Sequence, residues 1–380
     1  MQTADFLIIG GGIAGISAAA RLSAHGKVIV LEAETAIGYH SSGRSAAFYH
    51  LGLGNPLVRG LTVWSRDFFE SPPEGFSEAP LSTPVHALFI ATETMVPALE
   101  DLHRAMALYT DTVERTDDAA MRALCPLLRF GDEGIVAGVV DHGGRGLDAD
   151  ALLQGFARQV RTNGQILTGQ RIASIRQQGP DWQVTSEKGE HFSAPVLINA
   201  AGSWADGIAQ MAGVAPLGLQ PKRRTIIVFD PPKNTDARSW PFIKTAVDEF
   251  YMVPQGNRLI ASPNDEIDSD PCDAQPEDYD LALAAWRVEQ FTTMTVPRIA
   301  HKWAGLRTFA PDRMPVAGYA PEAPGFFWLA GQGGFGLQTS PAMAVIAEAL
   351  VTGAAWPEGL ETVGVLPENL SAMRFNRREF

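Results

Sequence analysis

Cysteine is rare in this sequence: only Cys125 and Cys272 occur among its 380 residues. The two lie far apart, without a CxxC spacing and without a pair of histidines nearby. This excludes a disulfide scaffold and a cysteine-based zinc or iron–sulfur site, and we expect no metal centre. So few cysteines are also typical of a reducing compartment, which favours a cytoplasmic protein.

Positive charge is also scarce. The 30 Lys and Arg residues are outnumbered by 43 Asp and Glu, which gives a formal net charge of −13 at pH 7. A chain this acidic lacks the basic surface that binds nucleic acids or anionic membranes. We expect no nucleic-acid partner, while peripheral contact with the inner face of the membrane stays open as an alternative location.

Long apolar runs and repeats are missing as well. The one candidate targeting segment, MQTADFLIIGGGIAGISAAA at the start, is interrupted by three consecutive glycines and has no positive charge before Arg21. It is too short to span a bilayer, so we expect no transmembrane segment. With 46% hydrophobic and 19% charged residues, the sequence predicts a globular protein of two or three domains.

A glycine motif stands between two short apolar runs near the N-terminus. The runs cover residues 5–9 and 27–31, and a helical pattern lies between them, which predicts a βαβ unit. Gly10, Gly12 and Gly15 fit the GxGxxG pattern at the start of that helix. They would allow the tight turn, the approach of a pyrophosphate and close packing of helix on sheet.

Glu32 ends the second run, 20 residues after Gly12, where an acidic residue binds ribose hydroxyls. Strand, glycines, helix, second strand and acid together predict a dinucleotide site. The next segment, GYHSSGRSAAFYH at residues 38–50, is rich in small and hydroxyl side chains and can line a pyrophosphate and a flat ring. It favours FAD over NAD, the alternative being a plain polar loop.

A second strand–glycine–helix pattern at residues 325–340 predicts that one nucleotide-binding domain is built from separated pieces. The fold class is therefore α/β (α+β overall), a Rossmann-like FAD-binding domain with an inserted antiparallel-sheet substrate domain. We assign residues 1–75, 145–215 and 300–380 to the FAD-binding domain, and residues 76–144 and 216–299 to the substrate-binding domain.

Six segments resemble the D-amino acid oxidase-like FAD-dependent oxidoreductases and, within that family, most closely the D-arginine dehydrogenases. They are DFLIIGGGIAGIS (5–17), GYHSSGRSAA (38–47), LINAAGSWAD (197–206), LQPKRR (219–224), WAGLRTFAPDRMP (303–315) and GFFWLAGQGGFGLQTS (325–340). The resemblance implies FAD and oxidation of an amino acid at its α-carbon. Members that attach flavin covalently near the C-terminal half use a cysteine there; none follows Cys272, which implies noncovalent FAD.

The resemblance also implies a set of cofactor-binding residues. Ile172 matches an aliphatic position beside the adenine, and the helix after the second glycine cluster faces the pyrimidine edge of the flavin. The full set is Gly10, Gly12, Ile13, Ala14, Gly15, Glu32, Ala33, Ser42, Gly43, Arg44, Ser45, Ala46, Ala47, Ile172, Ala201, Gly202, Trp204, Gly305, Gly331, Gly333, Gly334, Phe335, Gly336, Leu337 and Gln338.

Arginine is the natural anchor for an amino-acid carboxylate because its planar fork binds both oxygens. Arg307 and one of Arg223 and Arg224 match the family's carboxylate-binding arginines. Neighbouring strand residues face opposite ways, so only one of that pair points inward, and the register with Tyr251 favours Arg224. Tyr251 would hydrogen-bond the same carboxylate. The alternatives are a surface salt bridge for each arginine and a plain core position for Tyr251.

Two further positions complete the predicted catalytic set. The Gly334 carbonyl would accept a hydrogen bond from the substrate amine. His50 lies in the loop HLGLGN (residues 50–55), which resembles the family's mobile lid. It is a candidate base, although a neutral amine donor needs none, and the alternative is a solvated loop histidine.

The substrate pocket is predicted from Phe48, Leu53, His86, Ala87 and Arg223. Ala87 stands where D-arginine dehydrogenases carry an acidic residue, and Phe48 and Leu53 replace a histidine and a tyrosine. Without a buried carboxylate the pocket loses its preference for a cationic side chain. We expect an apolar or small side chain, with His86 or His50 nearby, rather than D-arginine or D-lysine.

The sequence therefore predicts an FAD-dependent dehydrogenase or oxidase that passes the Cα hydride of a D-amino acid to flavin N5. The imino acid then hydrolyses to a 2-oxo acid and ammonia. Oxidation of glycine, sarcosine or another secondary amine, or of a 2-hydroxy acid, is the alternative. A structural flavoprotein that binds a partner is a different class. Oxygen, a quinone or another carrier remain equal candidates for the electron acceptor.

Overall fold

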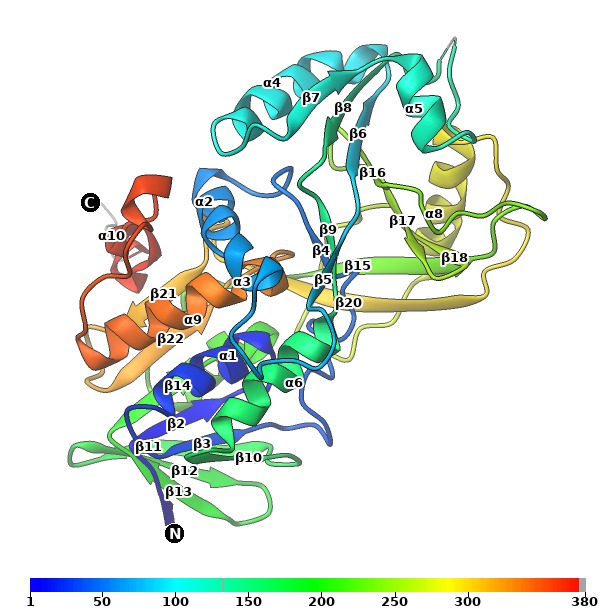
Figure 1. The fold of residues 1–380 in the computed structure, drawn as a ribbon. Coiled ribbons are helices and arrows are strands. Elements are labelled where there is room, and N and C mark those ends of the chain that lie inside the picture. The colour runs from blue at the N-terminus through cyan, green and yellow to red at the C-terminus, as the bar shows by residue number, and fades with distance from the viewer. Residues whose placement is uncertain (132, 376–380) are drawn as a thin grey trace, which may run out of the picture.

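The computed structural model describes residues 1–131 and 133–375. A six-stranded sheet forms the lower part of the molecule in Figure 1, and all of its pairs are parallel except the edge pair β21–β22. Its strands, in spatial order, are β10 (Gly164–Leu167), β3 (Val28–Leu31), β2 (Phe6–Ile9), β14 (Val196–Asn199), β22 (Phe326–Ala330) and β21 (Val316–Tyr319).

Both faces of this sheet are covered, which explains why its central strands are apolar throughout. On β2, Ile8 packs into one core while Leu7 and Ile9 pack into another, as the alternation of side chains along a strand requires. One face carries the helices α1 (Ile13–Leu22), α6 (Ala149–Val160) and α9 (Gly336–Thr352). The other face carries a four-stranded sheet of β1 (Gln2–Thr3), β13 (His191–Ala194), β12 (Asp181–Ser186) and β11 (Ile172–Gln178).

A nine-stranded sheet forms the upper part of the molecule. Its strands run β19 (Ile267–Asp268), β15 (Gln220–Phe229), β18 (Arg258–Ser262), β17 (Tyr251–Gln255), β16 (Phe242–Thr245), β6 (Ala87–Ala91), β8 (Ala137–Asp141) and β7 (Val113–Thr116), and β20 (His301–Phe309) pairs with the other edge of β15. The helices α4 (Val96–Ala107), α5 (Asp118–Leu124) and α8 (Asp278–Phe291) pack on it.

Short elements connect these layers. They are β4 (Phe48–Tyr49), β5 (Ser82–Pro84) and β9 (Arg145–Leu147), which form a three-stranded sheet, the helices α2 (Pro56–Trp64), α3 (Arg66–Glu70), α7 (Ala205–Met211) and α10 (Pro367–Leu370), and the 3₁₀ turns Glu93–Met95, Gly202–Trp204, Glu361–Val363 and Ala372–Phe375. None of the helices in the described part of the chain is long and apolar enough to cross a bilayer.

The fold class predicted from the sequence is confirmed, with two corrections to the second sheet. It is mixed rather than antiparallel, because β16 and β6 come from separate chain segments and pair in parallel. In addition, β20 is hydrogen-bonded to β15 along nine residue pairs. A domain boundary at residue 300 would divide two neighbouring strands of one sheet, so this pairing does not support that boundary.

Candidate active site and cofactor cleft

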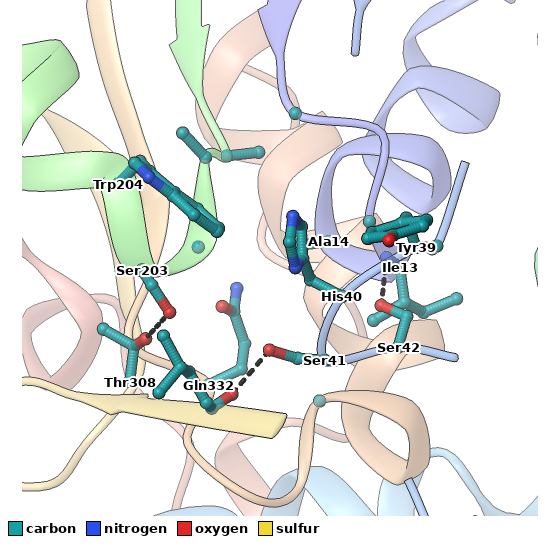
Figure 2. A pocket seen from close by; sticks show the side chains of 18 of the residues that line it. Ile13, Ala14, Tyr39, His40, Ser41, Ser42, Ser203, Trp204, Thr308 and Gln332 are labelled. Carbon is teal, nitrogen blue, oxygen red and sulfur yellow. Dashed lines mark hydrogen bonds between the residues drawn. The ribbon is translucent and has the colours of Figure 1, made fainter. Parts of the chain in front are cut away.

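A cavity of about 420 Å³ runs from the carboxyl ends of β2 and β3 to the strands β15 and β20. Most of the predicted cofactor residues line it: Gly10, Gly12, Ile13, Ala14, Glu32, Ala33, Ser42, Arg44, Ser45, Ile172, Ala201, Gly202, Trp204, Gly305, Gly331, Gly333, Gly334, Gly336 and Leu337. In Figure 2, Ser41 and Ser42 from one loop and Ser203 and Trp204 from another lie on different sides of this cavity.

The glycine turn at the cavity has the shape that a dinucleotide needs. Gly10 has a φ of +112°, and a Cβ there would lie 2.3 Å from the Ala200 carbonyl oxygen. A Cβ at Gly15 would lie 2.0 Å from the Gly10 oxygen, so helix α1 packs directly on the turn. Gly12, the N-cap of α1, faces only Ser42 Oγ at 3.4 Å. The Ile13 N–H donates to Ser42 Oγ at 2.9 Å, and the other N–H groups of this helix start can receive a pyrophosphate.

Glu32 is fixed at the end of β3 by two backbone hydrogen bonds. Its Oε2 accepts from the Gly11 N–H at 2.6 Å and its Oε1 from the Glu34 N–H at 2.8 Å. Each carboxylate oxygen keeps a further lone pair, and the residue lines the cavity. These residues fit the ribose of FAD, with Ile172 lining the same end of the cavity.

Several cavity residues were missed by the sequence analysis. His40 contacts Glu34 Oε1 at 3.1 Å and lies against Trp204, with 4.7 Å between ring centroids. Ser203 and Thr308 share a 2.8 Å hydrogen bond, and Tyr39, Ser41 and Gln332 also line the cavity. They belong to segments that were recognised, but spacing alone does not show which side chains of an irregular loop point inward.

Six predicted cofactor residues do not line the cavity: Gly15, Gly43, Ala46, Ala47, Phe335 and Gln338. Gln338 is buried and donates to Thr62 Oγ1 at 2.8 Å, while Phe335 packs on Phe309 and Val58. Arg44 does line the cavity, but its guanidinium pairs with Asp273 and donates to the Ala274 and Ala304 carbonyls. The six residues that do not line the cavity lie behind its surface, and Arg44 lines it with a guanidinium that is already paired.

The two arginines Arg224 and Arg307 line the other end of the cavity. Arg224 is 4% exposed and donates to the Asp265 carbonyl at 2.6 Å and to Glu266 at 3.2 Å. Burial and the Arg307 charge lower the pKa of Arg224 to about 10. Within residues 1–131 and 133–375, no carboxylate lies within 4 Å of the Arg307 guanidinium. Arg224 also donates to Asn264 Oδ1 and lies 3.9 Å from the Asp265 carboxylate, so it is largely compensated, whereas Arg307 beside it, uncompensated in the described chain, can bind an anion.

Arg223 points the other way, as strand alternation requires. Its guanidinium lies 2.9 Å from Asp280 and also contacts Glu277, both on the α8 side of the sheet. Arg223 is not a cavity residue, which corrects its place in the predicted substrate pocket. Gly334 lies beside the clamp formed by Arg224 and Arg307, since a Cβ there would be 2.9 Å from Arg307 Nη1.

Tyr251 and His50 are buried close to this end but do not line the cavity. Neither Tyr251 Oη nor His50 Nδ1 has a hydrogen-bond partner in the described part of the chain. The interpretation of His50 as a solvated loop histidine is wrong: it is 1% exposed and packs on Phe89 and Phe242. Burial, and secondly the Lys244 charge, lower the pKa of His50 to about 3.

The remaining predicted pocket residues lie away from the cavity. His86 is exposed and contacts His142, with 3.1 Å between the two Nδ1 atoms. Ala87 is completely buried, Phe48 stacks on Phe242 at 4.5 Å, and Leu53 is partly buried in its loop. For Ala87 and the preceding His86 the reason is topological, because β6 lies four strands from β15, roughly 19 Å at the usual strand spacing.

The sequence model of FAD-dependent oxidoreductases matches residues 5–350 of this chain. The chain belongs to this family. FAD is the cofactor of this family, and the cavity residues fit FAD. The resemblance expected from the sequence is confirmed at family level. A specific closeness to D-arginine dehydrogenases stays a prediction.

Individual relatives are more distant. Hydrogen cyanide synthase subunit HcnC of Pseudomonas protegens is 26% identical over 258 residues, which cover 65% of this chain and 58% of HcnC. Glycine oxidase of Pseudomonas aeruginosa is 26% identical over 373 residues, 91% of this chain and 94% of that enzyme. The chain thus spans about half the length of some of these relatives, such as HcnC, and nearly the whole length of others, such as the glycine oxidase.

Among solved structures, L-proline dehydrogenase from P. horikoshii superposes with a TM-score of 0.84, covering 100% of this chain and 99% of that chain. The sequence identity is 18%, so this similarity shows the fold alone.

Proposed function

We propose that this protein is an FAD-dependent dehydrogenase or oxidase of a small amino acid, with a D-amino acid as the substrate. The observation that carries the proposal is the pair Arg224 and Arg307 at one end of the cofactor cavity. When bound, FAD supplies the redox chemistry by accepting a hydride from the substrate α-carbon.

The chain's own residues bind and orient the substrate. Arg307 holds the carboxylate through its guanidinium fork, and Arg224 adds a second positive charge from the adjacent strand. Tyr251 Oη, buried without a partner in the described residues, donates to the same carboxylate. The Gly334 carbonyl accepts from the neutral amine, so that the nitrogen lone pair is available as hydride leaves.

Glycine or a secondary amine is the second candidate. Two of the relatives described above are a glycine oxidase and an L-proline dehydrogenase, and both align along nearly the whole chain. A 2-hydroxy acid is less well supported, because it needs a base for its hydroxyl proton. His50, the candidate base, is buried with its pKa lowered to about 3, which makes it a weak base, and His86 is exposed beside His142.

Anaerobic mixing of the holoenzyme with single substrates tests the proposal. D-amino acids, their L-enantiomers, glycine, sarcosine and 2-hydroxy acids are compared while the yellow flavin absorbance is followed. We expect bleaching by D-amino acids, with release of a 2-oxo acid and ammonia. Bleaching by glycine or sarcosine alone would favour the second candidate, and no bleaching by any of them would support a structural role for FAD.

A further inference from the structure

A buried lysine shares the sheet face that carries the two arginines. Lys244 pairs with Tyr251 across β16 and β17, and Tyr251 pairs with Ser262 across β17 and β18. The β15–β18 register pairs Ile227 with Ala261, which places Ile226 opposite Ser262. Arg224 lies two residues before Ile226 and therefore on the same face as Ser262. Paired residues point to one side of a sheet and alternate residues along a strand do the same. Lys244, Tyr251 and Arg224 therefore face one side.

Arg307 belongs to this face too. It pairs with Lys222, two residues before Arg224, across β15 and β20. Arg223, between them, faces away toward Asp280. One side of the sheet thus presents four cations: Arg307, Lys222, Arg224 and, three strands further along, Lys244. Lys222 is paired with Asp268.

Lys244 is 3% exposed and, like Tyr251, does not line the cavity. Its ammonium has one charged partner in the described chain, the carboxylate of Asp248. The Asp248 side chain is itself 66% exposed. An ammonium can donate three hydrogen bonds, so this pair leaves donors of a buried charge unused. A partner as exposed as Asp248 can move into water when another anion arrives.

The surroundings of Lys244 hold further polar atoms without partners. Tyr251 Oη and His50 Nδ1 are both buried and unpaired among the described residues. The His50 ring lies 4.9 Å from that of Phe242, and Phe242 lies 5.6 Å from Tyr251. Lys244 on β16 lies three strands from Arg224 on β15, roughly 14 Å at the usual strand spacing, with Tyr251 on the strand beside Lys244. Two long side chains that lean toward each other and a small molecule with two charged ends can together span this separation.

We propose that Lys244 binds a negatively charged group on the substrate side chain, so that the preferred substrates are amino acids with a second carboxylate. Glutamate and aspartate represent this class. The inference rests on the proposed function: the α-carboxylate occupies Arg224 and Arg307, and the side-chain carboxylate replaces Asp248 at Lys244. It replaces the expectation of an apolar side chain, because a buried cation on this face favours an anionic one.

Binding of glutarate tests the site without turnover, because glutarate has two carboxylates and no oxidisable amine. Butyrate is the matched ligand with one carboxylate. Titration calorimetry of the holoenzyme should show glutarate bound about tenfold more tightly or better, the range of one charge-assisted hydrogen bond. In Lys244→Met the two ligands should bind equally, and in Lys244→Arg the preference should remain.

Two more variants separate a ligand site from a merely structural ion pair. In Asp248→Asn, glutarate should bind more tightly than in the wild type, since the competing carboxylate is gone. A structural pair predicts instead that Asp248→Asn and Lys244→Met weaken both ligands alike. Lys222→Met is the control, because Lys222 pairs with Asp268 on the same sheet outside the cavity and should leave the preference unchanged.

Turnover distinguishes failure of this inference from failure of the proposed function. Wild-type kcat/KM for D-glutamate should exceed that for D-glutamine, and Lys244→Met should remove the difference. If amino acids reduce the flavin but wild-type enzyme does not favour glutarate or D-glutamate, the Lys244 site is wrong and the function stands. If no amino acid reduces the flavin while glutarate binding depends on Lys244, the proposed function fails and the dicarboxylate site remains.

Discussion

Arg224 and Arg307 lie on adjacent strands at one end of the cofactor cavity, and the charge of Arg307 adds to burial in lowering the pKa of Arg224. Like charges this close are unfavourable unless an anion joins them. This relationship makes the arginine pair the first target for mutation.

Replacement of Arg307 by lysine keeps the charge but removes the planar fork. We expect kcat/KM for the best substrate to fall roughly tenfold to a hundredfold, mainly through KM, because ground-state carboxylate binding is lost. Steady-state kinetics with saturating FAD measures this. Arg223→Lys is the matched control, since it keeps a cation for Asp280 on the other face and should change kcat/KM less than about twofold.

Replacement of Gly334 by alanine should damage the same site by steric means. The added Cβ would lie 2.9 Å from Arg307 Nη1, and the Gly334 φ is not left-handed, so the arginine must move. We expect kcat/KM to fall about tenfold or more with FAD affinity retained. Gly318→Ala, where the nearest atom would be at 3.6 Å, should be nearly silent. Equal loss in both variants would refute the assigned contact.

His50 should make the protein less stable in acid. Its pKa is lowered to about 3, first by burial and then by the Lys244 charge, with Arg59 acting in the same direction and Asp248 opposing it. Below its unfolded value of about 6.5, the unfolded chain binds a proton that the folded chain does not. Stability is therefore lost as pH falls from about 6.5 toward 3.

The size of this effect can be measured between pH 7.5 and 4.5. His50 alone should contribute about 2–3 kcal/mol to the fall in the free energy of unfolding over that interval. Denaturant unfolding of His50→Gln should show a fall smaller by that amount. The exposed His191 provides the control, because His191→Gln should keep the wild-type pH dependence. An identical pH dependence in His50→Gln and the wild type would contradict the prediction.

Glu32 should determine FAD affinity. In Glu32→Gln one of the two backbone N–H groups, of Gly11 or Glu34, faces an amide nitrogen instead of an oxygen acceptor. Loss of one charge-assisted hydrogen bond should raise the Kd of FAD by about tenfold. Fluorescence titration of apoprotein, prepared by release of the noncovalent cofactor, measures it. Glu348→Gln, a surface change beside Arg21, should leave the Kd unaltered.

D-Arginine should be a poor substrate. The buried cation Lys244 shares the sheet face of Arg224 and Arg307, so a cationic side chain meets like charge there instead of an ion pair. Comparison of kcat/KM for D-arginine with D-leucine, D-methionine and D-phenylalanine tests this expectation. A preference for D-arginine above roughly tenfold, worth about 1.4 kcal/mol, would contradict it.

Much of the fold could be predicted because it depends on local pattern. The runs at residues 5–9 and 27–31 became β2 and β3, and the helix predicted between them became α1, which ends at Leu22. Alternation along a strand also predicted that only one of Arg223 and Arg224 faces inward, and the register with Tyr251 favoured Arg224. The strand β13 (His191–Ala194) was missed, because four residues flanked by polar ones give too short a pattern.

The sequence did not reveal the features that depend on distant contacts. Lys244 lies in a four-residue strand and would ordinarily be read as an exposed lysine; its burial comes from pairing of β16 with β6 and β17. His50 lies in a loop with two glycines, and it is buried by Phe89 and Phe242, which are far away in the sequence. Such contacts leave no local periodicity to recognise.

The nine residue pairs that join β15 and β20 have a consequence for binding affinity. Because Arg224 and Arg307 sit on one hydrogen-bonded ribbon, their spacing is set during folding and is already correct when a ligand arrives. Binding energy is then not spent on assembling the receptor, and the two guanidinium groups act as a preorganised unit.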